Sequence, residues 1–324
     1  MAEGKERQLV LLAAPQITSP VTTQTIMRNV LVALAPAFVA SVAFFGLPAL
    51  VVTATSVASC VGFEYLWCRL RKLPNTAWDL SAAVTGVLLA FNLPATIPLY
   101  MVVIGAFVSI IVTKELFGGI GCNFANPAVV GRIFLAVAFP VAMTTFVAPH
   151  LTLSSVDMVS SATPLSPAAQ TLAHLDLLLG AHMGVLGETS AAAILVGFAY
   201  LLATRTIRWH APVAYVATVA VLSVLAGQDP VAQVLSGGLL LGGVFMITDY
   251  TTTPATKRGK VVFAIGCALI TCLIRFFGNL NEGVAYSILF MNLLVPYIDD
   301  LTPNVPVGGE AQRRSARKGG KGHE

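Results

Sequence analysis

Long apolar stretches alternate with short polar connections along the whole sequence. Each stretch is close to the length of about 20 residues that an α-helix needs to cross the hydrocarbon core of a bilayer. The pattern therefore predicts about ten transmembrane helices. They cover residues 29–46, 48–67, 79–93, 98–116, 127–148, 188–204, 210–227, 233–248, 261–277 and 283–299.

The composition supports a membrane protein and excludes an ordinary soluble domain. Hydrophobic residues make up 56% of the chain and charged residues only 10%, whereas roughly a quarter of the positions in a soluble domain are charged. The fold class that follows is an all-α integral membrane protein. The five cysteines show no CxxC spacing, so we interpret them as small apolar residues in helix packing and predict no metal site.

Lys and Arg fall into alternate connections, and this predicts the orientation, because basic residues are retained on the cytoplasmic side. Eighteen of the 19 follow this pattern, and Arg275 is the exception. Both termini are then cytoplasmic, with an N-terminal segment at 1–28 and a disordered basic tail at 300–324. The net charge of +4 reflects this asymmetry and gives no case for nucleic-acid binding. The long hydrophilic loop at 149–187 faces the opposite side.

The chain also shows a weak internal repeat. Residues 81–96 and residues 236–256 are each a short, Gly-rich apolar segment that ends in a polar break containing proline. Two groups of five helices, 29–148 and 188–299, must lie in opposite orientations, which is the inverted repeat of many transporters. We expect helices 3 and 8 to be short and broken, with an internal site between them. Alternatively, the glycines only permit close helix packing.

Few ionisable residues lie within the apolar segments. Glu64 and Glu115 are interpreted as interfacial partners of nearby basic residues, because long charged side chains near helix ends reach toward water. Asp249 ends helix 8, where it either caps the break or binds a cation. Asn126 followed by Pro127 fits the start of helix 5.

The long loop contains the sequence Asp157-Met-Val-Ser160-Ser161-Ala162-Thr163. From the residues alone this is a Ser/Thr/Pro loop of a common kind, in which Ser166 would cap a short amphipathic helix. On that interpretation the loop carries no chemistry.

A family resemblance gives the loop a different interpretation. The chain resembles the D subunits of Rnf ion-translocating electron-transport complexes and the related B subunits of sodium-translocating NADH:quinone reductases. Besides the loop, the matching segments are residues 79–94, 114–119, 126–128, 187–190, 245–260 and 281–296. The loop resembles the flavinylation motif Asp-x-x-Ser-Gly-Ala-Thr, with Ser161 in place of the usual glycine.

The resemblance implies a flavoprotein with no catalytic acid or base and no metal ligand of its own. Thr163 would carry FMN through a phosphoester, attached by a flavin transferase that recognises Asp157, Ser160, Ser161 and Ala162. The protein would relay electrons between ferredoxin and NAD in the bacterial cytoplasmic membrane, coupled to Na⁺ or H⁺ translocation. Its partners would be other membrane subunits, iron–sulfur subunits and a second covalent flavoprotein. A noncovalent riboflavin is also implied.

Two alternatives stay open at this point. The chain could be the B subunit of the quinone-reducing complex, although only about 28 residues precede the first helix and that protein generally has a longer N-terminal region. It could also be a stand-alone channel or transporter for a small solute, because inverted halves with broken helices fit that function equally well.

Overall fold

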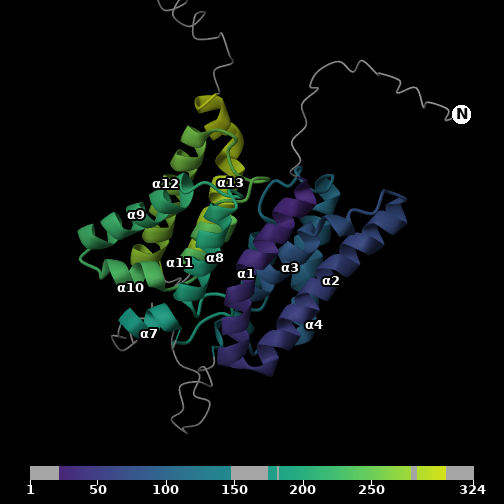
Figure 1. Cartoon of the computed structure of the whole chain (residues 1–324), viewed down its shortest axis with the longest axis horizontal. Coiled ribbons are helices and arrows are strands. Elements are labelled where there is room, and N and C mark those ends of the chain that lie inside the picture. Colours follow the sequence, from purple (N-terminus) through teal and green to yellow (C-terminus); the bar gives the residue numbers. More distant parts are fainter. Residues whose placement is uncertain (1–21, 147–173, 181, 279–282, 304–324) are drawn as a thin grey trace, which may run out of the picture.

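The computed structural model describes residues 22–146, 174–180, 182–278 and 283–303, and these form helices and connections without strands. The all-α prediction is therefore confirmed for the described part (Figure 1). The predicted flavin motif, from Asp157 to Thr163, lies outside these residues, as does most of the basic tail.

The first half contains the elements predicted for it, with one break that the pattern did not reveal. Phe139 and Pro140 divide the predicted helix 127–148, because Pro140 starts a new helix and cannot continue the old one. The elements are α1 (Thr23–Phe45), α2 (Leu47–Arg71), η1 (Ala77–Asp79), α3 (Ser81–Phe91), α4 (Leu99–Phe107), the π-helix η2 (Val108–Val112), η3 (Glu115–Phe117), α5 (Pro127–Ala138) and α6 (Pro140–Thr144).

The second half begins after the long loop. Helix α13 bends by 58° near Pro296, whose ring removes a backbone donor from the helix. The elements are α7 (His174–Leu179), α8 (Ala191–Ala203), α9 (His210–Leu225), α10 (Pro230–Leu235), α11 (Leu239–Leu241), the π-helix η4 (Gly242–Met246), α12 (Lys257–Phe277) and α13 (Val284–Leu301).

Among the described helices, four are long and apolar enough to span a bilayer alone, and the bent α13 is a fifth if its two arms count as one span. Four shorter apolar helices, α3, α5, α8 and α9, pack among them. The chain is thus a multi-pass membrane protein, and the count of ten spans stays a prediction.

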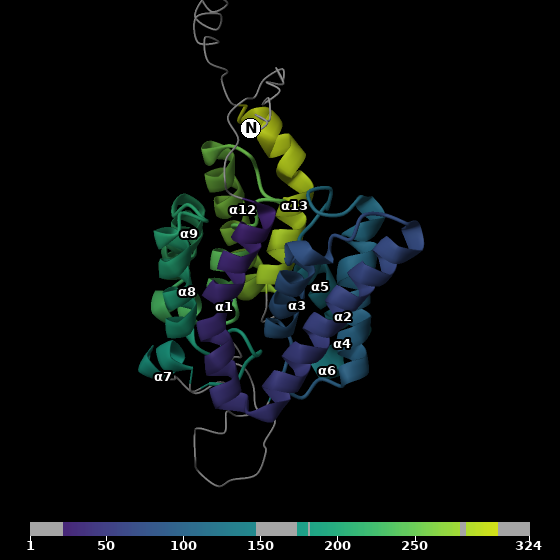
Figure 2. The same ribbon diagram turned by 45° about the vertical axis from the view of Figure 1, so that its right-hand side comes forward.

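The start of α1 and the end of α13 lie at the same end of the molecule, and α6 and α7 lie at the opposite end (Figures 1 and 2). Hydrogen bonds join the elements at the first end. The Asn29 amide donates to the Thr206 hydroxyl at 3.2 Å, and the Thr256 and Thr302 hydroxyls lie 3.0 Å apart. Helices α6 and α7, which precede and follow the long loop, thus lie at the end opposite to the start of α1, and the orientation in the membrane stays a prediction.

The two halves pack closely where α1 crosses α8. A Cβ atom on Gly197 would collide with the carbonyl oxygen of Ala33, so only glycine permits this approach. Glycine therefore permits close helix packing at this position, which is the alternative role predicted for it, in a protein that also has broken helices.

Both broken helices start at a residue with left-handed backbone conformation. Leu80 precedes α3 with φ +66°, and Gly238 precedes α11 with φ +66°. Helix α3 ends after 11 residues, and α11 changes into the π-helix η4 before the chain leaves the helix. The prediction of short, broken helices 3 and 8 is confirmed.

Candidate functional site

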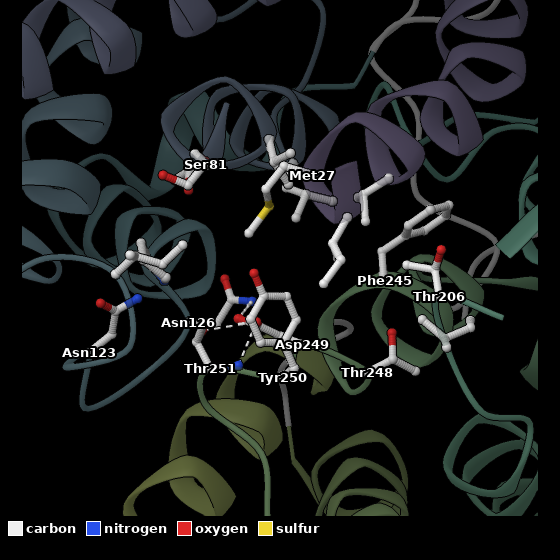
Figure 3. Close-up of a pocket in the computed structure, with 18 of the residues that line it drawn as sticks. Met27, Ser81, Asn123, Asn126, Thr206, Phe245, Thr248, Asp249, Tyr250 and Thr251 are labelled. Atoms are coloured by element: carbon white, nitrogen blue, oxygen red, sulfur yellow. Dashed lines mark hydrogen bonds between the residues drawn. The ribbon is translucent and has the colours of Figure 1, made fainter. Parts of the chain in front are cut away.

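A cavity lies between the two broken helices, bordered by α1, α3, the loop before α5 and the exit of η4 (Figure 3). It contains about 750 Å³ of space that no atom fills, part of it open to solvent. The cavity lies where the sequence predicted an internal site.

One wall of the cavity is apolar and the other is polar. Met27 of α1, Val84 and Leu88 of α3 and Phe245 of η4 form much of the apolar wall. The polar residues are Asn123, Asn126, Thr248, Asp249, Tyr250 and Thr251 at one side, with Ser81, Thr85, Lys114 and Thr206 elsewhere on the border. A flat apolar ligand with polar edges would match this lining.

Asp249 caps the break after η4. Its Oδ1 accepts hydrogen bonds from the Thr251 backbone N–H at 3.0 Å and from the Thr251 hydroxyl at 2.9 Å, and its Oδ2 accepts from the Thr252 hydroxyl at 3.2 Å. This turn satisfies backbone groups that the broken helix leaves free. Of the two roles predicted for Asp249, the capping role is confirmed.

Asn126 joins the loop before α5 to the same break. Its Oδ1 accepts from the backbone N–H groups of Ala128 and Val129, so it caps α5 as predicted, and its Nδ2 donates to Asp249 Oδ2 at 3.3 Å. Asn123 differs, because its Oδ1 is buried and has no hydrogen-bond partner among the described residues. A buried acceptor without a partner is costly unless a ligand or water supplies a donor.

A buried ionic network borders the cavity at the start of α3. Lys114 Nζ donates to Glu64 Oε2 and to Ser81 Oγ, each at 2.7 Å, and Glu64 Oε1 accepts from the Thr76 hydroxyl at 2.8 Å. Glu64 has no exposed surface and Lys114 is 2% exposed. The interfacial role predicted for Glu64 is therefore wrong, because its partner is Lys114 in the interior and not the basic residues that follow α2.

Glu115 is also buried, and its Oε1 lies 3.8 Å from Lys114 Nζ. It is a partner of Lys114, as predicted, but away from water. The sequence placed both carboxylates near helix ends and could not show that both are buried in the interior.

A second polar cluster holds the exit of α3. The backbone N–H groups of Leu186 and Gly187 donate to the carbonyl oxygens of Leu93 and Phe91 at 3.0 and 2.9 Å. Arg132 Nη1 donates to Asn92 Oδ1 at 3.1 Å. A helix that ends inside a membrane protein needs such partners, because no water is available to its backbone.

Two arginines whose buried positions the charge pattern did not predict belong to these clusters. Arg132, expected beside a loop, is buried within α5. Arg275, the exception to the charge pattern, donates to the carbonyl oxygens of Gln233, Ser236 and Gly237 at 2.7, 2.9 and 3.0 Å. An apolar helix that carries one arginine was the available signal, since such a charge needs an internal partner.

The predicted flavin-attachment residues are not part of this geometry, because Thr163, Asp157, Ser160, Ser161 and Ala162 lie outside the described residues. Of the cysteines, four are buried as predicted and Cys122, in the loop before α5, is exposed.

Comparisons with known proteins match most of the chain. The model of the NQR2, RnfD, RnfE family matches residues 10–308. The chain is 43% identical to the D subunit of the Na⁺-translocating ferredoxin:NAD⁺ oxidoreductase complex of Acetobacterium woodii, covering 92% of this chain and 94% of that protein. It is 38% identical to the D subunit of the proton-translocating ferredoxin:NAD⁺ oxidoreductase complex of Clostridium ljungdahlii, covering 95% and 98%. It is 34% identical to the D subunit of the ion-translocating oxidoreductase complex of Cronobacter sakazakii, covering 90% and 97%.

Proposed function

Because the chain belongs to the NQR2, RnfD, RnfE family, we propose that it is a membrane subunit of an Rnf-type ferredoxin:NAD⁺ oxidoreductase complex. It relays electrons through covalent FMN on Thr163 while the complex moves Na⁺ or H⁺. The names of the relatives support the oxidoreductase, and two of these names give different ions, so either ion agrees with them. The protein acts with the other membrane, iron–sulfur and covalent-flavin subunits of its complex and has no independent activity.

The flavin loop supports the redox proposal through its sequence and its place in the chain. Thr163 ends the segment Asp157-Met-Val-Ser160-Ser161-Ala162-Thr163, and a threonine hydroxyl can form a phosphoester with FMN. Helices α6 and α7, which precede and follow the loop, lie at the end opposite to the start of α1 (Figure 2). With both termini in the cytoplasm, the flavin is then on the outer side of the cytoplasmic membrane. A tethered flavin accepts and passes on electrons without leaving its protein.

The test is in-gel fluorescence of the denatured protein, purified from cells that contain the flavin transferase. We expect a fluorescent band in the natural protein and none in Thr163→Ala. Thr171→Ala, in the same loop, is the matched control and should keep the band. A natural protein without flavin would refute the proposal, and mass spectrometry of the loop peptide would identify the modified residue.

We further propose that the cavity between α3 and η4 holds the noncovalent riboflavin. The apolar wall formed by Met27, Val84 and Phe245 suits the flavin ring, and the buried Asn123 Oδ1 without a described partner suits a hydrogen bond from a ring N–H or a ribityl hydroxyl. Asn126 and Thr251 border the same side. The residues present thus fit the cofactor, which would serve as an internal redox group.

Flavin analysis after protein precipitation distinguishes the two flavins, because only riboflavin is released. Asn123→Leu removes the orphaned acceptor and fills its volume, so the riboflavin content should fall below that of the natural protein while the Thr163 band stays. Asn75→Leu, at an exposed position outside the cavity lining, should retain both. Full riboflavin in Asn123→Leu would place that flavin elsewhere.

A further inference from the structure

A second hollow adjoins the flavin cavity, with which it shares Thr206, Ile207, Thr248 and Tyr250, and lies toward the end of the molecule where α1 starts. Three segments line it, which are the connection between α8 and α9 with the start of α9, the exit of η4 and the first turn of α12, and it contains about 600 Å³ of space, part of it open. Its lining residues are Arg205, Thr206, Ile207, Arg208, His210, Ala211, Thr248, Tyr250, Lys257 and Lys260. Four permanently basic side chains and one histidine thus meet in one place, although they come from different segments.

No carboxylate in the described part of the chain forms an ion pair with these four basic residues. The Asp249 and Asp299 carboxylates attract Lys260 from a distance, and Arg208 repels it. The hollow also borders the start of α12, where the helix dipole adds partial positive charge. Positive charge therefore exceeds negative charge along the lining, which contains no carboxylate.

The surface next to the hollow has the character of a membrane interface. Trp209 is 57% exposed and packs edge-on against His210 with ring centroids 4.2 Å apart, and tryptophan is enriched where a protein passes from the headgroups into hydrocarbon. Along α12, beginning one turn after Lys257, an exposed apolar stripe runs toward the other end. It consists of Val262, Ile265, Leu269 and Leu273.

We propose that this hollow binds the phosphate group of an anionic phospholipid, with one acyl chain lying along the exposed stripe of α12. The basic hollow would face the phosphate, Trp209 the boundary between headgroup and hydrocarbon, and the apolar stripe the acyl chain. Basic pockets between helices recognise anionic headgroups in this way. A free phosphate ion would satisfy the charges but would give the stripe no role. The inference depends on the membrane location of the helices and is independent of the flavin proposals.

The chain offers a matched control for the charges. Arg258 lies in the same first turn of α12 and is exposed, but it does not line the hollow. The variant Arg208→Gln with Lys260→Gln removes two charges from the lining. The control Arg258→Gln with Arg69→Gln removes two charges from the basic positions outside it.

The experiment uses the intact complex in nanodiscs that contain a photoactivatable phosphatidylglycerol with its reactive group in the acyl chain. After illumination, mass spectrometry maps the labelled peptides. We expect label on α12 between Val262 and Leu273 in the natural protein. Each basic residue near a membrane surface contributes roughly 1 kcal/mol to anionic-lipid binding, so the lining variant should bind about thirtyfold more weakly, whereas the control should match the natural protein.

Four results would overturn the proposal. These are no label on α12 in the natural complex, equal labelling by a zwitterionic phosphatidylcholine probe, equal loss in the control, and displacement of the label by inorganic phosphate, which would assign the hollow to a soluble anion. Arg208→Lys with Lys260→Arg keeps the charges and should restore labelling. Retention of the Thr163 flavin band and of complex assembly shows that a variant is folded.

Discussion

The two broken helices solve one backbone problem with different side chains. Both start after a residue with left-handed backbone, Leu80 or Gly238, and a cation from the end of the following long apolar segment reaches that start. Lys114 donates to the hydroxyl of Ser81, the first residue of α3, and Arg275 donates to carbonyl oxygens before α11. In both halves, a cation thus supplies hydrogen bonds to polar groups at the start of an interrupted helix in the protein interior.

The difference between the halves lies in the charge that accompanies each cation. Lys114 pairs directly with Glu64 at 2.7 Å, so the first break contains a compensated ion pair. The described hydrogen-bond partners of Arg275 are oxygen atoms of backbone and amide groups, and the buried Glu188 carboxylate attracts it without a direct ion pair. The first half therefore depends on charge balance, and the second depends on the fork geometry of the guanidinium group.

The largest effect is expected from removal of the lysine in the first half. Lys114→Met leaves Glu64 as a buried carboxylate without its cation, which costs about 3–5 kcal/mol of stability. Lys114→Met combined with Glu64→Leu should recover most of this loss, because a well-packed apolar pair can replace a buried ion pair. Thermal unfolding of the detergent-purified complex measures both. Equal destabilisation of the single and double variants would show that charge balance is not the cause.

The corresponding change in the second half should cost less. Arg275→Met removes hydrogen bonds from a charged group to three carbonyl oxygens, and we expect a loss of about 2–3 kcal/mol. Arg275→Lys should restore only part of it, since an ammonium group cannot span the positions that Nη1 and Nη2 occupy. If lysine restores full thermal stability, charge alone suffices and the contrast between the halves fails.

The sequence predicted where the helices break, but it did not predict the hydrogen bonds and the ion pair that stabilise the breaks. The positions of helices 3 and 8 could be predicted from apolar segments, Gly-rich stretches and polar exits, because each of these signals lies within a short run of neighbouring residues. Lys114 and Glu64 are 50 positions apart, and Arg275 is 39 positions from Ser236. Hydrophobic periodicity carries no information on such pairs. The break at Pro140 shows the opposite case, in which a local signal was present within an apolar run that favoured one continuous helix.

The left-handed residues give a smaller contrast between the halves. Gly238→Ala should destabilise the second break by about 1–2 kcal/mol, because a side chain is disfavoured at φ +66°. Its Cβ would also lie 3.1 Å from Glu188 Oε2. At Leu80, glycine relieves the same strain, whereas alanine retains it, and both changes lose the apolar contacts of the partly buried leucine. Leu80→Gly should therefore be at least as stable as Leu80→Ala, and thermal unfolding that shows the reverse order would contradict this assignment.

The smallest expected effect concerns a tether that only the second break has. Asp229 caps α10, which leads into that break, and its Oδ2 lies 2.6 Å from His174 Nε2 of α7. The hydrogen bond from His174 lowers the pKa of Asp229 below its ordinary value. A carboxyl group with a lowered pKa in the folded state stabilises that state above its unfolded pKa of about 3.9, and the contribution is lost as the pH falls through the folded pKa.

Acid should therefore loosen α7 from α10 before it affects the rest of the second half. Hydrogen exchange of the α7 peptide, corrected for the intrinsic rate, should lose protection only as the pH falls below about 4, the ordinary pKa of an aspartate. In His174→Gln the loss should begin at higher pH, because the amide is neutral and forms a weaker hydrogen bond to the carboxylate. Identical profiles in the two proteins would show that His174 does not set the acid response, and the tether would then have no part in the difference between the halves.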